Sequence, residues 1–489
     1  MTRRLAPALR DWLPGQRWFA GKGAPVTAVV PLSAGRLGAG LQHLLVRVEQ
    51  PGRAPETYQL LVATGSETPP GLPDRAVIGR LSDGRLVYDA LHNPAHAERL
   101  LALLLGRSPL PAGLAAGQLP SPPPGGSTPP LRAGALAPRV NTAEQSNTSV
   151  VYGDRMIAKL FRRVTPGTNP DLELTRALAA AGSTRVPTPL AWLETTPAGP
   201  EPPATLALLQ QFLRGGRDGW ELALSRAAEL APQSPTPASG TAPTGNFAAE
   251  SFLLGRATAE VHLTLARVLP TALLGPSDAE LLIGAMTDRL NEAAEAVPAL
   301  REYRSALLAI YRDLEDRLRS GRPLLVQRIH GDLHLGQSMR TPRGWVLLDF
   351  EGEPATPLAE RRRLQPAARD VSAMLRSFDY AAAHRLLGEE TRPDPEAEQR
   401  AVRWCARNRE AYCAGYAAAG GRDPRADPAL LRAFETDKAV YEVVYEARNR
   451  PAWLPIPLAA IRRLTAARGA AAKEGAGPAA PYSPNGRLG

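Results

Sequence analysis

Apolar residues alternate with polar ones along much of the first hundred positions, and glycine and proline interrupt the alternation at short intervals. The runs 44–48 (L-L-V-R-V) and 58–62 (Y-Q-L-L-V) have the composition of strands. Nothing in this stretch suggests catalytic chemistry. We therefore expect a small sheet-containing unit at the start of the chain.

A second pattern begins at residue 149. Two apolar runs, S-V-V-Y and R-M-I-A-K-L-F, flank Gly153 and Asp154, and such a pair is typical of the turn in a β-hairpin. Asn169 and Pro170 then have the order of a helix N-cap and first helical residue, and D-L-E-L-T-R-A-L continues at helical spacing. The next apolar run, 206–212, ends at R-G-G, as a strand before a linker would. The predicted local order is strand, strand, helix, strand.

Beyond residue 245 the spacing is mainly helical, with two exceptions. A short apolar run at 324–326 precedes the polar sequence H-G-D-L-H-L-G-Q (330–337), and another at 345–348 leads directly into D-F-E-G-E-P (349–354). Segment 119–130 is rich in proline, 231–245 in Pro, Ser, Thr and Gly, and 469–489 in Gly, Ala and Pro. We expect a boundary loop, a surface insertion and a disordered tail at these three places.

Length and charge narrow the class of protein. A chain of 489 residues exceeds what one hydrophobic core usually serves, so two or three folded units are expected. The formal net charge of +10 would suit nucleic acid, anionic lipid or a polyphosphate ligand, but the sequence has no nucleic-acid-recognition motif and no membrane-spanning apolar stretch. We expect a soluble cytoplasmic protein with no nucleic acid or membrane partner, in which Cys405 and Cys413 are core residues.

Three polar residues near the ends of the two short strands suggest phosphoryl transfer. Asp332 lies in the first polar loop, Gln337 follows five residues later, and Asp349 ends the second strand. If the two strands form a hairpin, all three residues lie close together at the same end of it. Phosphoryl transfer needs metal-held phosphates, a positioned acceptor hydroxyl and a carboxylate that receives its proton. The sequence therefore predicts an ATP-dependent small-molecule kinase.

Several blocks resemble the kinase-like phosphotransferases related to aminoglycoside and choline kinases, and the maltokinases in particular. The blocks are L-P-G-Q-R-W-F-A-G-K (13–22), Q-R-I-H-G-D-L-H-L-G-Q (327–337), L-L-D-F-E-G-E-P (347–354), L-A-E-R-R-R (358–363), R-D-V-S-A-M-L-R-S-F-D-Y (369–380) and Y-E-V-V-Y-E-A-R-N-R-P-A-W-L-P-I-P-L (441–458). The resemblance implies an α+β, bilobal protein-kinase-like fold with an N-terminal cap domain. Its expected parts are a cap (1–105), an N-lobe with an intermediate segment (106–213), a helical C-lobe (214–468) and a disordered tail (469–489).

The same resemblance assigns expected roles around ATP and Mg²⁺. Asp332 would be the catalytic base, and Gln337 and Asp349 would hold the metal. Lys159 would pair with Glu173 and contact the nucleotide phosphates. The remaining nucleotide-binding candidates are Ser146, Asn147 and Thr148 in the loop E-Q-S-N-T-S (144–149), and Gln210 and Phe212 at the interlobe linker.

Other polar residues near the catalytic block have two interpretations. His330 and His334 flank Asp332, and His-x-Asp-x-His could bind a metal, whereas the resemblance makes His330 a loop-stabilising hydrogen bonder and leaves His334 between support and substrate contact. Asp370 could cap a helix or brace the catalytic loop. Glu351 stands where protein kinases have glycine and is not included among the expected metal ligands.

The acceptor expected from the resemblance is maltose, phosphorylated at its anomeric hydroxyl to maltose 1-phosphate for α-glucan synthesis. Trehalose synthase would then be a functional associate. Candidate sugar contacts share polar or aromatic character and are His334, Tyr441, Glu442, Tyr445, Arg448 and Trp453. A kinase for another sugar, such as glucosamine, and an inactive kinase-like binding module are the alternatives.

Overall fold

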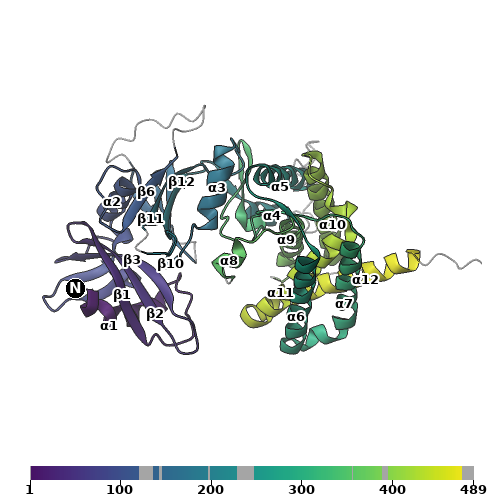
Figure 1. Cartoon of the computed structure of the whole chain (residues 1–489), viewed down its shortest axis with the longest axis horizontal. Coiled ribbons are helices and arrows are strands. Elements are labelled where there is room, and N and C mark those ends of the chain that lie inside the picture. Colours follow the sequence, from purple (N-terminus) through teal and green to yellow (C-terminus); the bar gives the residue numbers. More distant parts are fainter. Residues whose placement is uncertain are drawn as a thin grey trace, which may run out of the picture. The chain divides into compact units, whose positions relative to one another are not determined.

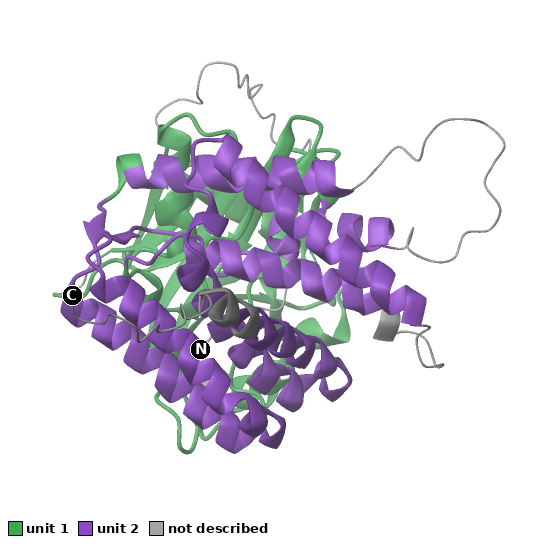
Figure 2. Ribbon diagram, turned by 90° about the vertical axis from the view of Figure 1, so that its right-hand side faces the viewer, with its two compact units in different colours: residues 1–217, 267–269, 339–363 green, residues 218–266, 270–338, 364–489 purple. Residues whose placement is uncertain are grey.

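The computed structural model describes residues 2–119, 136–141, 146–196, 199–227, 247–354, 356–387 and 395–475. The chain forms two compact units, which Figure 2 distinguishes by colour: unit 1 comprises residues 1–217, 267–269 and 339–363, and unit 2 comprises 218–266, 270–338 and 364–489. Of the segments expected to be irregular, 120–130, 231–245 and 476–489 lie outside the described residues. Residues 469–475, expected in the tail, instead continue helix α12 (Pro455–Gly475).

The first sheet of unit 1 contains both predicted N-terminal strands (Figure 1). Its strand order is β1-β2-β3-β5-β4, and β10 pairs with β3. Because successive side chains of a strand point to opposite faces of the sheet, each face has its own core. Leu44 and Val46 pack with Leu5 and Leu9 on one face, whereas Leu61 packs on the other. The elements are α1 (Thr2–Trp12), β1 (Ala28–Gly38), β2 (Leu41–Glu49), β3 (Glu56–Gly65), β4 (Val77–Arg80), β5 (Leu86–Asp89) and β10 (Arg163–Val164).

The second sheet of unit 1 contains the predicted hairpin. Its strand order is β6-β11-β12-β9-β8-β7, and β8 and β9 are joined at Gly153, whose φ of +59° suits glycine in the turn. The predicted helix is also confirmed, because Asn169 accepts a hydrogen bond from the N–H of Asp171 and Pro170 opens α3. The elements are α2 (Pro94–Leu104), β6 (Leu114–Gln118), β7 (Pro138–Val140), β8 (Thr148–Tyr152), β9 (Met156–Leu160), α3 (Pro170–Ala180), β11 (Pro189–Thr195) and β12 (Thr205–Gln211).

One buried amide ties the two sheets together. Gln59, on β3, donates from Nε2 to the carbonyls of Phe161 and Leu206 at 2.6 and 2.5 Å. These carbonyls belong to the second sheet's side of unit 1, and that of Leu206 also accepts from the N–H of Phe161 at 3.0 Å, so the buried amide adds hydrogen bonds between the two sheets. The cap strands and the hairpin strands therefore belong to a single packed body.

A later hairpin also belongs to unit 1, apart from its first residue, Ser338. Strands β16 (Ser338–Thr341) and β17 (Gly344–Leu347) precede Asp349 and the short helix α8 (Leu358–Arg361). The N–H of Leu347 donates to the carbonyl of Arg185 at 2.8 Å, which anchors β17. The sequence D-F-E-G-E-P is thus attached to the same body as Lys159, although almost 200 residues separate them.

Unit 2 is helical, as the spacing beyond residue 245 predicted. Its main core joins α6, α7, α11 and α12 through residues such as Leu290, Leu307 and Val440. Helices α5 and α10 approach closely, because a Cβ on Gly255 would lie 2.0 Å from the Tyr412 carbonyl oxygen. The elements are α4 (Gly219–Ala227), α5 (Phe247–Val268), β14 (Ala272–Leu273), α6 (Pro276–Ala296), α7 (Arg304–Arg319), β15 (Leu325–Val326), α9 (Ala368–Leu387), α10 (Pro395–Ala418), α11 (Pro428–Asn449) and α12.

Short elements complete the description. Strand β13 (Arg217–Asp218) lies where the sequence passes from unit 1 to unit 2. The 3₁₀ turns are η1 (Leu13–Gly15), η2 (Asp74–Ala76), η3 (Ala90–His92), η5 (Pro298–Tyr303), η6 (Leu335–Gln337), η7 (Pro424–Ala426) and η8 (Pro451–Trp453). Within the described ranges, every helix is too short or too polar to cross a membrane. Cys405 and Cys413 are buried and unbridged, as predicted.

Candidate active site

Lys159, on β9, lies among three carboxylates in unit 1. Its Nζ is 2.5 Å from Asp349 Oδ1, 2.5 Å from Glu351 Oε1 and 3.4 Å from Asp171 Oδ2. The side chains of Lys159 and Asp171 are only 11% and 2% exposed. We call these four residues the Lys159 group. Three separate parts of the sequence, a strand, a helix and a post-strand loop, supply its members.

The backbone at D-F-E-G is shaped to present its carboxylates. Asp349 has a φ of +59°, and among the described residues it is the one non-glycine with positive φ. Aspartate tolerates this conformation better than most residues, but it still costs roughly 1–3 kcal/mol. The following N–H, of Phe350, donates to Asp171 Oδ1 at 3.2 Å. The strained turn therefore directs Asp349 and Glu351 toward Lys159, and the hydrogen bond from Phe350 to Asp171 holds the turn in place.

The charges of the Lys159 group do not balance. One ammonium faces three carboxylates, which leaves two formal negative charges when all are ionised. Burial raises the pKa of Asp171 and of Glu351 above their ordinary values, and repulsion from Asp349 adds to the shift while Lys159 opposes it. The ligand oxygens of the three carboxylates all lie within 4.8 Å of one another. Because Mg²⁺ prefers carboxylate oxygens, this group could hold a divalent cation.

The prediction that Glu173 is the helix partner of Lys159 is wrong. The structure gives that place to Asp171, whereas Glu173 forms an ion pair with Arg362 at 3.2 Å. Residues two apart on an α-helix point roughly 200° away from each other. Since α3 turns Asp171 toward the sheet, Glu173 must face the other way. The sequence carried both acids in one helical turn, so spacing alone could not choose between them.

The expected phosphate loop is described in part. Asn147 donates from Nδ2 to Glu351 Oε1 at 2.6 Å and to Ser146 Oγ at 3.2 Å, which connects the loop to the Lys159 group. Thr148 is instead bound into the sheet, because its hydroxyl accepts a hydrogen bond from Arg162 at 2.8 Å. Glu144 and Gln145 lie outside the described residues. Binding of phosphate by this loop stays a prediction.

Gln210 and Phe212 lie where the sequence predicted, at the end of β12 and just after it. Gln210 pairs with Ile157 on one side and Pro189 on the other. The N–H of Phe212 donates to the carbonyl of Arg155 at 2.9 Å, so this backbone donor is already engaged within the protein. Contact of either residue with adenine stays a prediction.

A cavity of about 370 Å³ lies within unit 1 and shares part of its wall with the Lys159 group. Asn147, Asn169 and Glu351 form this shared wall. The cavity also touches Trp18, near the N-terminus, and Arg163, whose guanidinium binds Glu56 at 3.0 Å. Its size is at the lower end of the range for small-molecule sites, about 300–1,000 Å³.

Unit 2 holds the catalytic loop predicted around Asp332. Asp370, on α9, accepts hydrogen bonds from the N–H groups of His330 and Gly331 at 2.8 and 2.9 Å. Its carboxylate also lies 3.0 Å from Nε2 of His262, a buried residue that the sequence analysis did not single out. Burial alone would raise the pKa of Asp370, but the hydrogen bond from His262 and nearby histidine charge hold it below its ordinary value. Asp370 therefore braces the loop that carries Asp332.

Both histidines of the loop have a structural function. His330 is buried, and its Nδ1 accepts a hydrogen bond from the N–H of Asp332 at 3.4 Å. His334 Nδ1 accepts from the N–H of Gly336 at 3.1 Å and so caps the turn that ends at Gln337. These contacts support the loop-stabilising interpretation for His330 and the support interpretation for His334. Gln337 belongs to unit 2 and Asp349 to unit 1, and their joint binding of metal stays a prediction.

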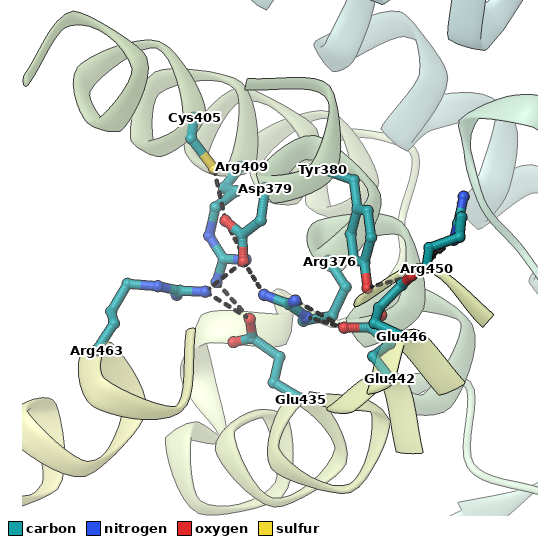
Figure 3. A network of polar contacts seen from close by, with 10 residues as sticks. All are labelled: Arg376, Asp379, Tyr380, Cys405, Arg409, Glu435, Glu442, Glu446, Arg450 and Arg463. Atoms are coloured by element: carbon teal, nitrogen blue, oxygen red, sulfur yellow. Dashed lines mark hydrogen bonds and ion pairs between the residues drawn. The ribbon is translucent and has the colours of Figure 1, made fainter. Parts of the chain in front are cut away.

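Glu442, predicted to contact sugar, is instead part of the interior of unit 2. Its Oε2 accepts hydrogen bonds from Nε and Nη2 of Arg376 at 2.8 and 2.6 Å, as Figure 3 shows. Arg376 has no exposed side-chain surface and Glu442 has 11%. The helical spacing of α11 turns this glutamate inward against α9. The carboxylate is occupied by a structural ion pair.

The other predicted sugar contacts lie at the accessible side of α11 and just after it. The rings of Tyr441 and Tyr445 stack at 6.3 Å, and Tyr445 is 43% exposed. The guanidinium of Arg450 lies over the rings of Tyr445 and Trp453 at 5.5 and 4.4 Å. Arg448 is exposed near the end of the helix. This row of aromatic rings and cations could pack against the apolar face of a sugar.

Two comparisons of sequence identify the family. The model of the maltokinase N-terminal cap domain matches residues 12–93. A glucosamine kinase of Streptacidiphilus jiangxiensis is 30% identical over 330 residues, which cover 64% of this chain and 70% of that enzyme. The chain belongs to the same family of aminoglycoside phosphotransferase-like kinases. A glucosamine kinase of Mycolicibacterium smegmatis is 29% identical over 333 residues, covering 66% of this chain and 78% of that enzyme.

Solved structures confirm the predicted fold. A glucosamine kinase in complex with glucosamine, ADP and inorganic phosphate matches with a TM-score of 0.65 at 22% identity and covers 93% of this chain and 98% of that one. A second crystal form of glucosamine kinase gives a TM-score of 0.67, also at 22% identity, over 92% of this chain and 97% of that one. The kinase-like α+β fold with an N-terminal cap was thus correctly predicted. The maltokinase resemblance is supported in the cap, whereas both relatives matched over most of their length are glucosamine kinases.

Proposed function

We propose that this member of the family is an ATP-dependent sugar kinase and that glucosamine is its acceptor. The Lys159 group carries the first part of the proposal, because a buried lysine among three carboxylates suits nucleotide phosphates and a divalent cation. The names of the two relatives, which match at 30% and 29% identity, support the second part. The order of acceptors expected from the sequence, with maltose ahead of glucosamine, is therefore reversed in this proposal.

In the proposed reaction, a sugar hydroxyl oxygen forms a bond to the γ-phosphorus of ATP while the bond to the β–γ bridging oxygen breaks and ADP leaves. Asp332 receives the hydroxyl proton, and its loop is kept in place by Asp370. Lys159 contacts the phosphates. Asp349, with Asp171 and Glu351 beside it, would hold Mg²⁺, and Gln337 stays a predicted ligand. When bound there, Mg²⁺ would supply positive charge against the phosphate oxygens.

Maltose is the second candidate acceptor, and the match of residues 12–93 to the maltokinase cap favours it. The aromatic row from Tyr441 to Trp453 also suits a longer sugar, because successive rings could support successive units. Phosphorylation would then occur at the anomeric hydroxyl and give α-maltose 1-phosphate. A functional association with trehalose synthase belongs to this candidate.

An acceptor screen tests the proposed function. The purified chain, ATP and Mg²⁺ are combined with glucosamine, N-acetylglucosamine, glucose or maltose, and both ADP and the sugar phosphate are measured. We expect the highest kcat/KM with glucosamine and a large loss with N-acetylglucosamine, which lacks the basic amine. A preference for maltose would select the second candidate, and no phosphorylated sugar at all would support the inactive binding module.

Asp332→Asn tests the assignment of the base. We expect kcat to fall by at least about 10³-fold, within the range found for lost general bases, because the amide cannot take the hydroxyl proton. Affinity for ADP, measured by calorimetry, should stay within about threefold because Asp332 is not part of the Lys159 group. Near-normal turnover in Asp332→Asn would reject this residue as the base.

A further inference from the structure

A second lysine lies beside the proposed base. Lys438, on α11, places its Nζ 3.8 Å from Asp332 Oδ1, and the two side chains are 28% and 24% exposed. This separation is an ion pair but exceeds hydrogen-bond length, about 2.7–3.2 Å. The two groups are therefore not joined by a direct hydrogen bond. A hydroxyl that hydrogen-bonds to Asp332 also comes within reach of the Lys438 ammonium.

Neighbouring groups hold the lysine in this position. Its Nζ lies over the ring of Tyr441 at 4.8 Å, a favourable place for a cation. Lys438 and Tyr441 are three residues apart on one helix, so the ring restricts the otherwise flexible lysine chain. The Asp332 carboxylate and this ring contact the ammonium, and the Glu442 carboxylate, one helical turn further along α11, also attracts it electrostatically.

Helix α9 fixes both members of the pair. Through Asp370 and Ser377 it holds the loop of Asp332, since Ser377 Oγ accepts from the N–H of Leu335 at 3.0 Å. Through Arg376 it holds α11, by the buried ion pair with Glu442, which lies one turn beyond Lys438. Figure 3 shows this connection between the two helices. The distance between Lys438 and Asp332 is thus set by a common rigid support.

The choice of lysine is informative in this chain. Of its 58 basic residues, four are lysines: Lys22, Lys159, Lys438 and Lys473. Arginine serves nearly everywhere else, including the buried ion pairs of unit 2. Lysine differs because its ammonium is compact and can direct three donors into a small space. Two of the four lysines lie against carboxylates of the two proposed active groups, Lys159 at Asp349 and Lys438 at Asp332.

We propose that Lys438 is a positioning residue for phosphoryl transfer, an inference that rests on the proposed function. Its ammonium orients the Asp332 carboxylate and donates to the acceptor hydroxyl oxygen or its neighbour, so that the hydroxyl proton points at Asp332. When the oxygen bonds to phosphorus, the proton passes to Asp332 and Lys438 keeps its own protons throughout. The ammonium also offsets negative charge brought by the transferred phosphoryl group.

Substitution with matched controls tests this role. We expect Lys438→Met to lower kcat about 100-fold, as loss of a positioning contact does, with the KM for ATP within about threefold of wild type. Lys438→Arg should recover about tenfold of that loss because it restores the charge but not the compact shape. Lys22→Met, at an exposed position in unit 1, should match wild type. In the Asp332→Asn background, Lys438→Met should have little additional effect, since the two residues act together.

The outcomes separate this inference from the proposed function. If wild type phosphorylates a sugar and Lys438→Met stays within about twofold of it, the role of Lys438 is overturned and the kinase assignment stands. If wild type phosphorylates no sugar, the proposed function fails. Lys438 is then tested by NMR after reductive ¹³C-dimethylation, which retains the lysine charge and labels four lysines. Asp332→Asn should shift the one lysine signal that Lys438→Arg removes, and an unshifted signal would overturn the pair.

Discussion

Two groups of charges in this protein, each built around a buried cation (Lys159 or Arg376), have opposite character. The Lys159 group in unit 1 sets one ammonium against three carboxylates. The network of unit 2 drawn in Figure 3 sets four arginines (Arg376, Arg409, Arg450 and Arg463) against four carboxylates (Asp379, Glu435, Glu442 and Glu446). We call this second group the Arg376 network. Carboxylates outnumber ammonium groups three to one in the first group, with Arg361 as a further positive charge nearby, whereas arginines and carboxylates are equal in number in the second.

The proton affinities of the two groups show the same contrast. Burial raises the pKa of Asp171 and Glu351, because a single lysine cannot offset it for all three carboxylates. Burial would also raise the pKa of Asp379, but Arg463, Arg376 and Arg409 outweigh burial and hold the pKa below its ordinary value. A charge cluster whose ions are paired within the protein, such as the Arg376 network, is typical of a structural core. A cluster with an excess of one charge, such as the Lys159 group, is typical of a ligand site.

The largest effect should come from removing one carboxylate of the Lys159 group. We expect Asp349→Asn to lower kcat by about 10³-fold or more, because it removes a proposed ligand for Mg²⁺. Stability should stay the same or rise, since repulsion among the carboxylates decreases. Steady-state kinetics and urea unfolding check the two expectations. If Asp349→Asn loses stability but keeps its kcat, the Lys159 group is structural and does not differ in role from the Arg376 network.

The opposite result is expected in the Arg376 network. Arg376→Met leaves Glu442 buried without its partner and should lower the free energy of unfolding by about 3–5 kcal/mol, the usual cost of breaking a buried pair. Arg319→Met is the matched control, because Arg319 is 68% exposed in its pair with Glu315 and should change stability by less than about 1 kcal/mol. Urea unfolding measures both. If Arg376→Met is as stable as Arg319→Met, the network does not support the fold.

A smaller effect distinguishes the two acids of α3. Asp171→Asn should lower kcat about 10- to 100-fold, because Asp171 holds both Lys159 and the backbone of Phe350. Glu173→Gln, two residues away, should stay within about threefold because its partner is Arg362. Both variants are compared by kcat/KM for ATP. A larger loss in Glu173→Gln than in Asp171→Asn would restore the original pairing.

The smallest effect concerns pH and Mg²⁺. Since the pKa values of Asp171 and Glu351 are raised in the fold, their ionisation disfavours the folded state as pH rises from the ordinary carboxyl range, near 4, through the raised values. Mg²⁺ should reverse this penalty, raising Tm by a few degrees at pH 8 and by less at pH 5.5, where protons compete for the carboxylates. Thermal unfolding in Mg²⁺ and EDTA measures the difference. Asp349→Asn should reduce the increase at pH 8, and a pH-independent increase would speak against binding at these carboxylates.

Local structure was predictable because it depends on neighbouring residues. The hairpin around Gly153 and the helix after Asn169 both form where the sequence placed them, since turn and capping preferences act over a few positions. The polar blocks around Asp332 and Asp349 were recognisable for a similar reason, because their chemistry is contained in short runs. These features, with the order of the blocks, led from sequence to the kinase-like fold.

Only the tertiary structure decided which side chains meet. Asp171 and Glu173 share one turn of α3, but packing turns only Asp171 toward Lys159. On α11, packing turns Glu442 into the core and Lys438 toward Asp332. Which partner a helical side chain meets depends on the face of the helix that packs against neighbouring elements. Residues distant in sequence determine that packing. The sequence by itself determined the reaction class and the elements that carry it. The pairing of charges, and with it the distinction between a site and a structural core, came from the fold.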